Sequence, residues 1–253
     1  MRKTEHFLLL TWLITMGLIT AAMVVVVDSG LLSALIATDR SYVSVILIVM
    51  YVLGAGHSLR RTWFLSVELN RVTEAERLLA ENPASLTIDK TGLTIVGGSA
   101  LPPGMLNNYV QDLTRAQAVL SNAPGELSAA SSDLLEAAIG RLRGAHDFGW
   151  FMIDLMLKVG FLGTLIGFIW MLSSVSNHAV IDASSMQIIL REMSHGMGIA
   201  LNTTLVSLVT ATLLSAPYYL LARGLDELVE GIVRLTEVEI LPRLRQANGR
   251  PLR

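Results

Sequence analysis

The chain has 253 residues, of which 52% are hydrophobic and only 16% are charged, and its formal net charge is −2. A soluble domain carries about 25% charged residues, so this composition indicates an integral membrane protein. The small net charge excludes a broadly basic surface for nucleic acid. The absence of cysteine excludes disulfides, thiol catalysis and cysteine-ligated metals.

Residues 7–27 form the first predicted membrane span, an uncharged run that follows Arg2 and Lys3. A membrane-spanning helix needs about 20 apolar residues, whereas the core of a signal peptide has about 7–15. We therefore expect this segment to be retained as a span. The second uncharged run covers residues 41–59, so residues 1–59 are expected to form a first transmembrane hairpin.

Residues 60–147 are expected to form a mostly helical cytoplasmic segment. Apolar residues recur at helical spacing in its first part and should share one broad face: Leu65, Leu69, Val72, Leu78 and Leu79. Residues 83–104 combine turn residues with short β-like runs at 87–88 and 93–96. Two alternatives stay open for this stretch, a small β-hairpin and a plain loop.

The second pair of spans is expected within residues 148–222, at 159–175 and 193–222, joined by a short loop over 176–191. No proline interrupts residues 133–163, so one helix should run from the cytoplasm into the third span. The fourth span should continue as a helix to Leu241, where Pro242 ends it. Residues 223–253 then form a helical extension and a basic tail.

Lysine and arginine gather on one side of these spans, which sets the expected orientation. Only Arg40 and Arg191 fall on the other side. Both termini and the long middle segment should therefore be cytoplasmic. The residues that define this bias are Arg2, Lys3, Arg60, Arg61, Arg141, Arg143, Lys158 and Arg223.

Small residues mark one face of the third span, where Gly160, Thr164 and Gly167 recur at spacings of four and three. Gly163 and Gly167 also form a Gly-x-x-x-Gly pair. Small residues let two helices approach closely in lipid. The alternative is that they leave room beside the Thr164 hydroxyl for another helix, for water or for an ion.

The fourth span has a similar face, formed by Gly196, Ala200, Thr203, Thr204 and Ser207. Serine and threonine hydroxyls can bond to the backbone of their own helix, so they are tolerated in a span. Ordinary helix packing explains this face, and so does the wall of a tight, partly hydrated cavity.

Neither of these two spans contains a carboxylate. Asp154 and Lys158 lie four residues apart near the cytoplasmic edge and are expected to form an interfacial charge pair. A hydroxyl cannot take up a proton near neutral pH. If ions move through this chain, the titrating acid should therefore come from another polypeptide.

Motifs for enzymatic chemistry are absent from the sequence. We find no Walker-type loop, no His-x-x-x-His pair and no Gly-x-Ser-x-Gly elbow. We therefore expect no enzyme, no metal site and no cofactor. The five histidines are expected to be interfacial side chains: His6, His57, His146, His178 and His195.

Two stretches resemble the MotA/TolQ/ExbB ion-channel family. "GFLGTLIGFIW" at 160–170 is similar to its third-helix motif, Gly-x-Leu/Ile-Gly-Thr-x-x-Gly. "GIALNTTLVSLVTATLLSAP" at 198–217 is similar to its fourth-helix motif, Ala-Leu-x-x-Thr followed by small residues and a proline. The resemblance implies an all-α membrane protein with four transmembrane helices, long cytoplasmic extensions and a pentameric ring.

The resemblance also implies a partner, a MotB/TolR/ExbD-like protein with a single span that carries an essential aspartate. Two copies of this partner would pass through the ring. Thr164 and Thr204 match the family's threonines beside that aspartate, and Pro217 matches a proline that bends the fourth helix. Ile199 stands where Tol- and TonB-type members typically have a glutamate.

The expected function is an ion-conducting subunit of a motor in the bacterial inner membrane, which transports H⁺ or Na⁺. Thr203 and Ser207 should lie beside the pathway, and the small residues should let the partner pass. Other expected partners are lipid and a cytoplasmic effector, but not nucleic acid. The alternatives are a non-conducting scaffold and a small-solute transporter, although the latter often shows an internal repeat. The ion and the driven process, whether flagellar, Tol- or TonB-like, gliding or antiphage defence, stay open.

Overall fold

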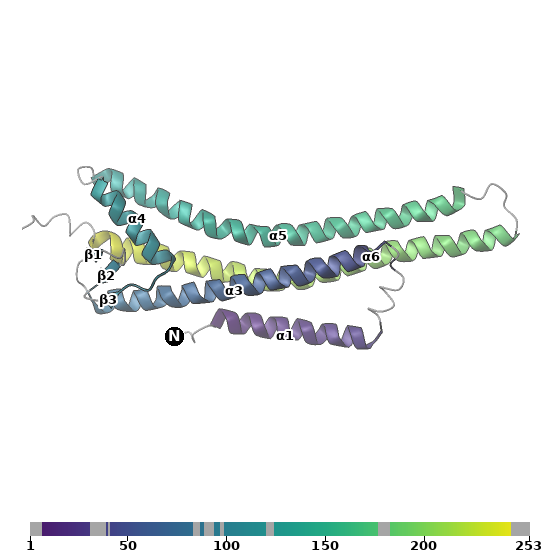
Figure 1. The fold of residues 1–253 in the computed structure, drawn as a ribbon, viewed down its shortest axis with the longest axis horizontal. Helices are drawn as coiled ribbons and strands as arrows, with labels where there is room; N and C mark the ends of the chain where they lie inside the picture. The colour runs from purple at the N-terminus through teal and green to yellow at the C-terminus, as the bar shows by residue number, and fades with distance from the viewer. Residues whose placement is uncertain are drawn as a thin grey trace, which may run out of the picture. The chain divides into compact units, whose positions relative to one another are not determined.

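A computed structural model describes residues 7–30, 39, 41–82, 87–88, 94–96, 99–119, 124–176 and 183–243. This part of the chain is predominantly helical (Figure 1). Its helices are α1 (Phe7–Asp28), α3 (Val43–Glu81), α4 (Met105–Val119), α5 (Pro124–Ser176), α6 (Ala183–Leu235) and the π-helix η1 (Thr236–Ile240).

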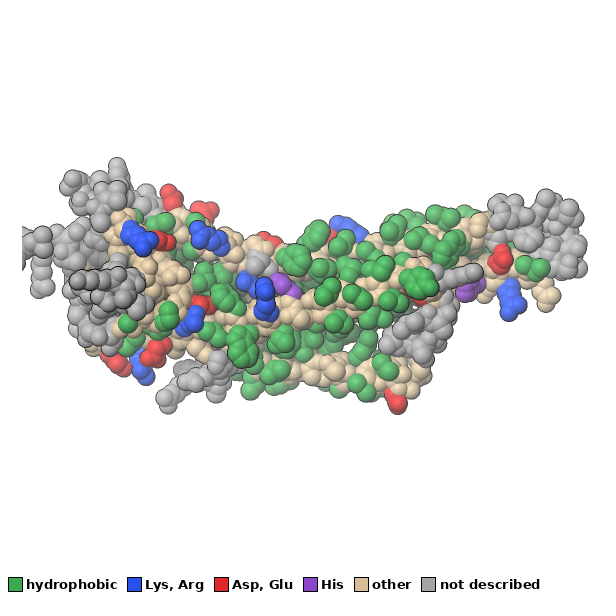
Figure 2. Space-filling model, viewed as in Figure 1, with side chains coloured by type: hydrophobic (Ala, Val, Ile, Leu, Met, Phe, Trp, Pro, Cys, Tyr) green, Lys and Arg blue, Asp and Glu red, His purple; other side chains and the backbone are tan. Residues whose placement is uncertain are grey.

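Four of these helices are long and apolar enough to cross a membrane, namely α1, α3, α5 and α6. Their hydrophobic side chains are widely exposed, as Figure 2 shows on one face. Leu18 is 73% exposed, for example, and Leu201 is 69% exposed. A monomeric soluble protein rarely exposes apolar patches of this kind, whereas lipid contact accounts for them.

The chain divides into two compact units. The first, which we call the apolar unit, consists of Thr11–Arg60 and Asp147–Leu220. The second, which we call the polar unit, consists of Met1–Leu10, Arg61–His146 and Leu221–Arg253. Helices α3, α5 and α6 each contribute residues to both units.

The apolar unit packs α1 against α3 and α3 against α6. The Trp12 Nε1–H on α1 donates to Ser58 Oγ on α3 at 3.1 Å. Gly54 on α3 faces Leu214 on α6 so closely that an added Cβ would lie 2.6 Å from a Leu214 methyl carbon. Trp12 of α1 therefore has a hydrogen-bond partner on α3, and Leu214 of α6 packs where α3 has only a glycine.

Asp39 caps the start of α3. Its carboxylate accepts hydrogen bonds from the backbone N–H of Ser41 at 2.9 Å and of Ser44 at 2.7 Å. Burial raises the pKa of Asp39, but the hydrogen bonds from Ser41 and Ser44 together outweigh it and lower the pKa. A carboxylate at this position satisfies N–H groups that have no partner within the helix.

The core of the polar unit is formed by α3, α4, α5 and α6. Of the face predicted on α3, Leu65, Val72 and Leu79 are buried, whereas Leu69 and Leu78 are partly exposed. Other core residues include Ala75 on α3, Leu106, Tyr109, Val110 and Leu113 on α4, Leu142 on α5, and Leu225, Leu228 and Ile232 on α6.

Glu68 is a buried carboxylate that connects α3 to α4. Its Oε2 accepts the backbone N–H of Met105 at 3.0 Å, and its Oε1 accepts from Arg71 at 2.6 Å. A Cβ at position 104 would lie 2.7 Å from Oε2, so Gly104 leaves the room for this contact. A negative charge at a helix N-terminus also interacts favourably with the helix dipole.

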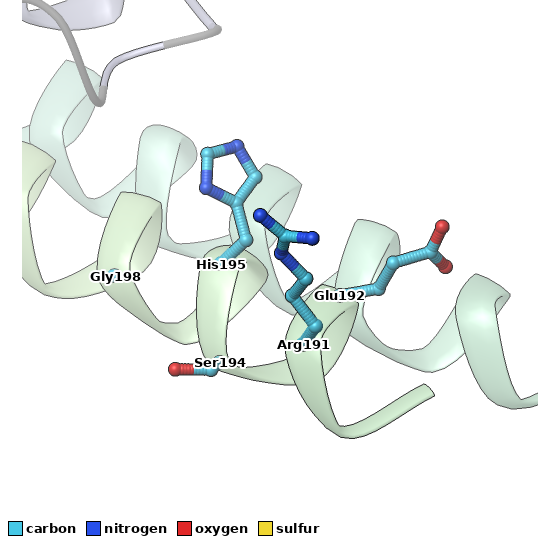
Figure 3. Close-up of a pocket in the computed structure, with 5 residues that line it drawn as sticks. All are labelled: Arg191, Glu192, Ser194, His195 and Gly198. Atoms are coloured by element: carbon cyan, nitrogen blue, oxygen red, sulfur yellow. The ribbon is translucent and has the colours of Figure 1, made fainter. Parts of the chain in front are cut away.

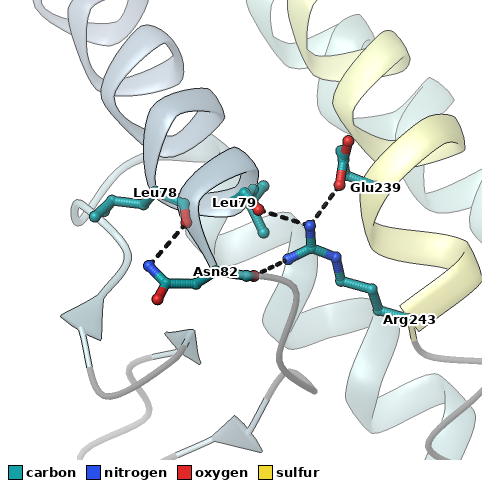
Figure 4. Close-up of polar contacts among 5 residues, drawn as sticks. All are labelled: Leu78, Leu79, Asn82, Glu239 and Arg243. Carbon is teal, nitrogen blue, oxygen red and sulfur yellow. Dashed lines mark hydrogen bonds and ion pairs between the residues drawn. The ribbon is translucent and has the colours of Figure 1, made fainter.

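Arg243, in the helical residues 241–243 that follow η1, contacts the end of α3 (Figure 4). Its guanidinium donates to the backbone oxygens of Leu79 at 2.7 Å and Asn82 at 2.9 Å, and it pairs with Glu239. These carbonyls belong to the last turn of α3, where oxygens lack partners within the helix. The side chain therefore acts as a C-terminal cap supplied from elsewhere in the chain.

The stretch between α3 and α4 contains three short antiparallel strands in the order β1-β2-β3. They are β1 (Thr87–Ile88), β2 (Thr94–Val96) and β3 (Ser99–Ala100). Thr87 pairs with Ile95, and Ile95 pairs with Ala100. Of the two alternatives for this stretch, the structure has the hairpin, in which β1 pairs with β2. The strand β3 pairs with β2 as a third strand.

Two predicted boundaries are wrong. Residues 183–191 belong to α6 rather than to a loop, since they contain neither glycine nor proline. Pro242 does not end the helix, because residues 241–243 are still helical. The π-helix η1 comes directly before it, and the Leu241 N–H donates to the Thr236 oxygen five residues back. A wider turn relieves the clash of a proline ring with the carbonyl four residues earlier.

Candidate ion pathway

Two glycines bring the backbones of α5 and α6 into contact. A Cβ added to Gly167 on α5 would lie 2.8 Å from the backbone nitrogen of Ala200 and 2.8 Å from the oxygen of Gly196. A Cβ added to Gly196 would lie 2.9 Å from the oxygen of Gly167. The two helices could not approach this closely with any larger residue at either position.

The other two glycines of the third span face hydroxyl residues of α6. A Cβ on Gly160 would lie 2.0 Å from Ser207 Oγ, and one on Gly163 would lie 2.8 Å from Thr203 Cβ. The space beside these glycines is thus filled by α6 of the same chain. This contact agrees with close packing of two helices, and passage of a partner span beside these residues stays a prediction.

Thr164 and Thr204 form a hydrogen-bonded hydroxyl pair between α5 and α6. Thr164 Oγ1 also lies 3.1 Å from the Gly160 oxygen and 3.4 Å from the Ala200 oxygen. The pair joins residues 40 positions apart, in the middle of the two spans that the sequence leaves without a carboxylate. The family resemblance singled out both residues, and the structure brings them together.

The backbone oxygen of Ala200 lies within reach of three hydroxyls. Thr203 Oγ1 and Thr204 Oγ1 each lie 3.1 Å away, and Thr164 Oγ1 lies at 3.4 Å. A carbonyl oxygen has two lone pairs and also accepts a helical N–H here, so all three hydroxyls cannot donate to it at once. The hydroxyl protons therefore have alternative arrangements, which suits a site that meets both charged and neutral groups.

Exposure separates the four hydroxyl residues predicted for the pathway. Thr203 and Ser207 are buried, with 0% and 2% of their surface exposed, and both lie against glycines of α5. Thr164 and Thr204 are partly exposed. Of these four residues, Thr164 and Thr204 are therefore the two whose side chains can meet a group outside the chain, and the role of all four in a pathway stays a prediction.

The predicted charge pair on α5 is present. Lys158 Nζ donates to Asp154 Oδ2 at 2.5 Å. Both side chains are more than half exposed. An exposed pair at this spacing contributes only about 0.3–0.5 kcal/mol, so it gives no independent evidence of a role in conduction.

An open hollow of about 540 Å³ lies along α6, lined by Arg191, Glu192, Ser194, His195 and Gly198 (Figure 3). Arg191 and His195 lie one helical turn apart and project to the same side. The residues that line the hollow all come before Ala200 and Thr204 in α6, and Gly198 is the one closest to them in the sequence. No group of three residues able to hold a metal ion occurs in the described ranges of the chain.

A contact of His57 with Tyr218 was not predicted. His57 Nδ1 lies 2.7 Å from the Tyr218 hydroxyl, although the two residues are 161 positions apart. No short sequence motif predicts a contact between residues so far apart in the chain. The only sequence signal is that His57 is one of two histidines inside the predicted spans, the other being His195.

The chain matches the family model described as the MotA/TolQ/ExbB proton channel family over residues 105–233, just over half of its length. The protein belongs to the MotA/TolQ/ExbB family. A search of curated proteins found no match. The family match begins at the start of α4 and ends near the end of α6, so it includes the whole α5–α6 contact and extends upstream of the two motifs.

Proposed function

We propose that this chain is the ion-conducting subunit of a membrane motor driven by the ion-motive force. Membership of a proton channel family supports a general role in ion conduction. The observation that carries the proposal is the partly exposed Thr164–Thr204 pair, placed between two spans that lack a carboxylate. These hydroxyls can solvate an ion, but they need an acid from another polypeptide to carry a proton.

The proposed partner is a protein with one span that carries an aspartate, two copies of which lie within a ring of five copies of this chain. A threonine hydroxyl can donate to a carboxylate and can accept from a carboxylic acid. The Thr164–Thr204 pair can therefore bind the partner's aspartate in both protonation states. Its hydroxyl protons rearrange around the Ala200 oxygen as the aspartate is loaded and unloaded.

The energy of ion transport is of the same order as the cost of a charged aspartate in the membrane. An ion that crosses 100 mV releases about 2.3 kcal/mol, and a charged aspartate costs about 2.5–3.5 kcal/mol at the centre of a spanning helix. Loading the aspartate removes this cost and lets the partner move past one subunit. Repeated steps of a two-fold partner in a five-fold ring produce rotation or force.

The orientation and the extensions are part of the proposal. The lysine and arginine bias places both termini and residues 60–147 in the cytoplasm. The parts of α5 and α6 in the polar unit then transmit the motion to a cytoplasmic effector. Arg243 ties the end of the C-terminal extension to α3, and Glu68 ties α3 to α4, which suits a unit that moves as one body.

Substitution of the hydroxyl pair tests the proposal. We expect Thr164→Val and Thr204→Val to abolish ion flux in liposomes that contain the full chain and its partner, with assembly intact. Thr210→Val is the matched control, because the Thr210 hydroxyl is buried on the same helix and bonds to the carbonyls of Val206 and Ser207. Normal flux in both variants would contradict the role given to the hydroxyl pair, whereas an assembled wild-type complex without flux would support the non-conducting scaffold.

A count of subunits tests the assembly independently. Native mass spectrometry of the complex should give five copies of this chain and two copies of the partner. A complete assembly that contains this chain alone would contradict the proposed stoichiometry.

A further inference from the structure

Tyr218 is held tightly within the apolar unit. Its side chain is fully buried, and an added Cβ on Gly149 of α5 would lie 1.8 Å from its ring. Its hydroxyl lies 3.3 Å from the Gly54 oxygen and 2.7 Å from His57 Nδ1, both on α3. Three helices thus fix the position of one phenol oxygen beside one imidazole nitrogen.

The hydrogen bonds of this cluster suit both protonation states of His57. When Nδ1 is unprotonated, it accepts the Tyr218 hydroxyl proton. When Nδ1 carries a proton, it donates to the Tyr218 oxygen, and the hydroxyl proton turns to the Gly54 oxygen. Only one hydroxyl hydrogen has to rotate, so His57 can gain or lose a proton without movement of a heavy atom.

The imidazole is also placed where it can exchange protons. His57 is partly exposed, and its ring meets the Phe148 ring edge-on at 5.4 Å between centroids and the Tyr218 ring at 6.2 Å. An unperturbed histidine titrates near pH 6.5. The four predicted spans contain no aspartate, glutamate, lysine or arginine, so His57 and His195 are their only groups that ordinarily titrate near neutral pH.

The cluster is separate from the threonine pair. Tyr218 follows Thr204 by 14 residues on α6, which is about 21 Å along the helix axis. Leu214 lies between them, fully buried and packed on Gly54. A continuous row of hydroxyls therefore does not lead from Thr204 to His57, and a proton has to reach His57 through water.

We propose that His57, positioned by Tyr218, is a second proton-binding site of the channel, at the end that the proposed orientation places next to the cytoplasm. It takes up, through water, the proton that leaves the partner's aspartic acid, and becomes an imidazolium. It then gives that proton to cytoplasmic water and returns to neutral imidazole, so that only N–H and O–H bonds change. This site rests on the proposed function as a proton channel.

Charged groups near the cluster in the chain influence its titration. Arg60 and Arg61 follow His57 on α3, Asp147 and His146 precede Phe148 on α5, and Arg223 follows Tyr218 on α6. The Arg61 guanidinium donates to the Leu142 oxygen at 3.0 Å. Tyr218 is a titratable group that contacts the imidazole directly.

Proton flux in liposomes that contain the full chain and its partner tests the site. We expect His57→Ala to lower the flux about 10-fold or more, since a positioned proton-transfer group commonly contributes about 100-fold or more. Added imidazole should restore part of the flux to this variant, with a pH dependence that follows imidazole. Tyr218→Phe keeps the ring and should move the midpoint of the pH profile while flux continues.

Two controls separate the outcomes. His195→Ala removes the other histidine of the spans and should leave the pH profile unchanged. If His57→Ala does not assemble, His57→Asn replaces it in the same assay. An unchanged pH profile in an assembled His57 variant overturns the proposal, as does a lost flux that imidazole fails to restore. A wild-type complex without proton flux, but with normal assembly, overturns the proposed function and this site with it.

Discussion

The apolar unit and the polar unit are held together by different contacts. In the apolar unit, α5 and α6 meet through glycines and through hydroxyls that bond to backbone oxygens. In the polar unit, two charged side chains with little exposure, Glu68 and Arg243, connect helices across 37 and 164 residues of sequence. The first unit depends on close fit, and the second depends on charge-assisted hydrogen bonds.

The difference agrees with the surroundings proposed for each unit, lipid for the apolar unit and water for the polar unit. Lipid is as apolar as leucine, so burial of apolar side chains gives little drive for helices to associate in a membrane. Close backbone approach and hydroxyl bonds remain available there. In water, a leucine-rich face can form a core, and charged groups can satisfy helix ends. Each unit should therefore be sensitive to a different kind of substitution.

The largest effect is expected from a single added methyl group in the apolar unit. Gly167→Ala places a Cβ 2.8 Å from two backbone atoms of α6 that cannot move independently. Overpacking of this kind costs about 1–3 kcal/mol, and we expect the upper end here. Thermal unfolding in detergent should show a clear loss of stability.

Gly17→Ala on α1 is the matched control for this substitution. A Cβ there meets nothing within 4 Å. It should be neutral or should stabilise the helix by about 0.5–1 kcal/mol. Equal effects at positions 17 and 167 would show that close packing of α5 on α6 is not what holds the apolar unit.

The next largest effect is expected from Glu68→Ala in the polar unit. The Glu68 side chain is only 3% exposed, and its removal leaves the Met105 N–H without the carboxylate that caps it. The cost of an unsatisfied buried donor is about 1–3 kcal/mol. Glu74→Ala is the control, because the Glu74 pair with Arg77 is exposed and should contribute less than about 1 kcal/mol. If thermal unfolding shows a comparable loss of stability in both variants, the buried contact of Glu68 with Met105 is no more important than an exposed ion pair.

A smaller and more local effect is expected from Arg243→Ala. The substitution removes the donor to the carbonyls of Leu79 and Asn82 (Figure 4). We expect faster amide hydrogen exchange over the last turn of α3 and a loss of about 1–2 kcal/mol. Arg234→Ala breaks only an exposed pair with Glu76 and should leave exchange in α3 unchanged. If the amides in the last turn of α3 exchange at the same rate in both variants, Arg243 does not cap that helix.

The smallest effect is expected at alkaline pH. Burial, with the nearby charge of Glu237, raises the pKa of Tyr109 from 10 to about 12. Since the folded state favours the protonated phenol, this contribution is fully present below pH 10 and is lost as pH rises through about 12. The loss amounts to less than about 1 kcal/mol at pH 10.5. Tyr109→Phe should lack this part of the pH dependence, and an identical pH profile in the two proteins would contradict it.

Local features of the sequence predict much of this structure. The uncharged runs at 7–27 and 41–59 lie within α1 and, apart from the first two residues of the second run, within α3. The absence of proline before Gly163 agrees with a continuous α5. The four-residue spacing of Asp154 and Lys158 gives the pair that the structure has. Helical periodicity and helix breakers act over a few residues, so the chain itself carries this information.

Contacts between distant residues could not be read in the same way. The glycines of α5 had two explanations, and the sequence alone does not show that they face α6 of the same chain. Glu68 has the same spacing to Arg71 as an ordinary surface pair, yet it caps a helix 37 residues away. His57 and Tyr218 meet because α3 and α6 pack together. The family resemblance was the one feature that connected Thr164 with Thr204 before the structure did.

Proton flux through reconstituted liposomes tests most directly whether this chain borrows its acid from a second polypeptide. Three samples are needed: the chain alone, the chain with its single-span partner, and the chain with a partner whose aspartate is replaced by asparagine. Our account predicts flux only in the second sample. Flux through the chain alone, or through the asparagine complex, would contradict it.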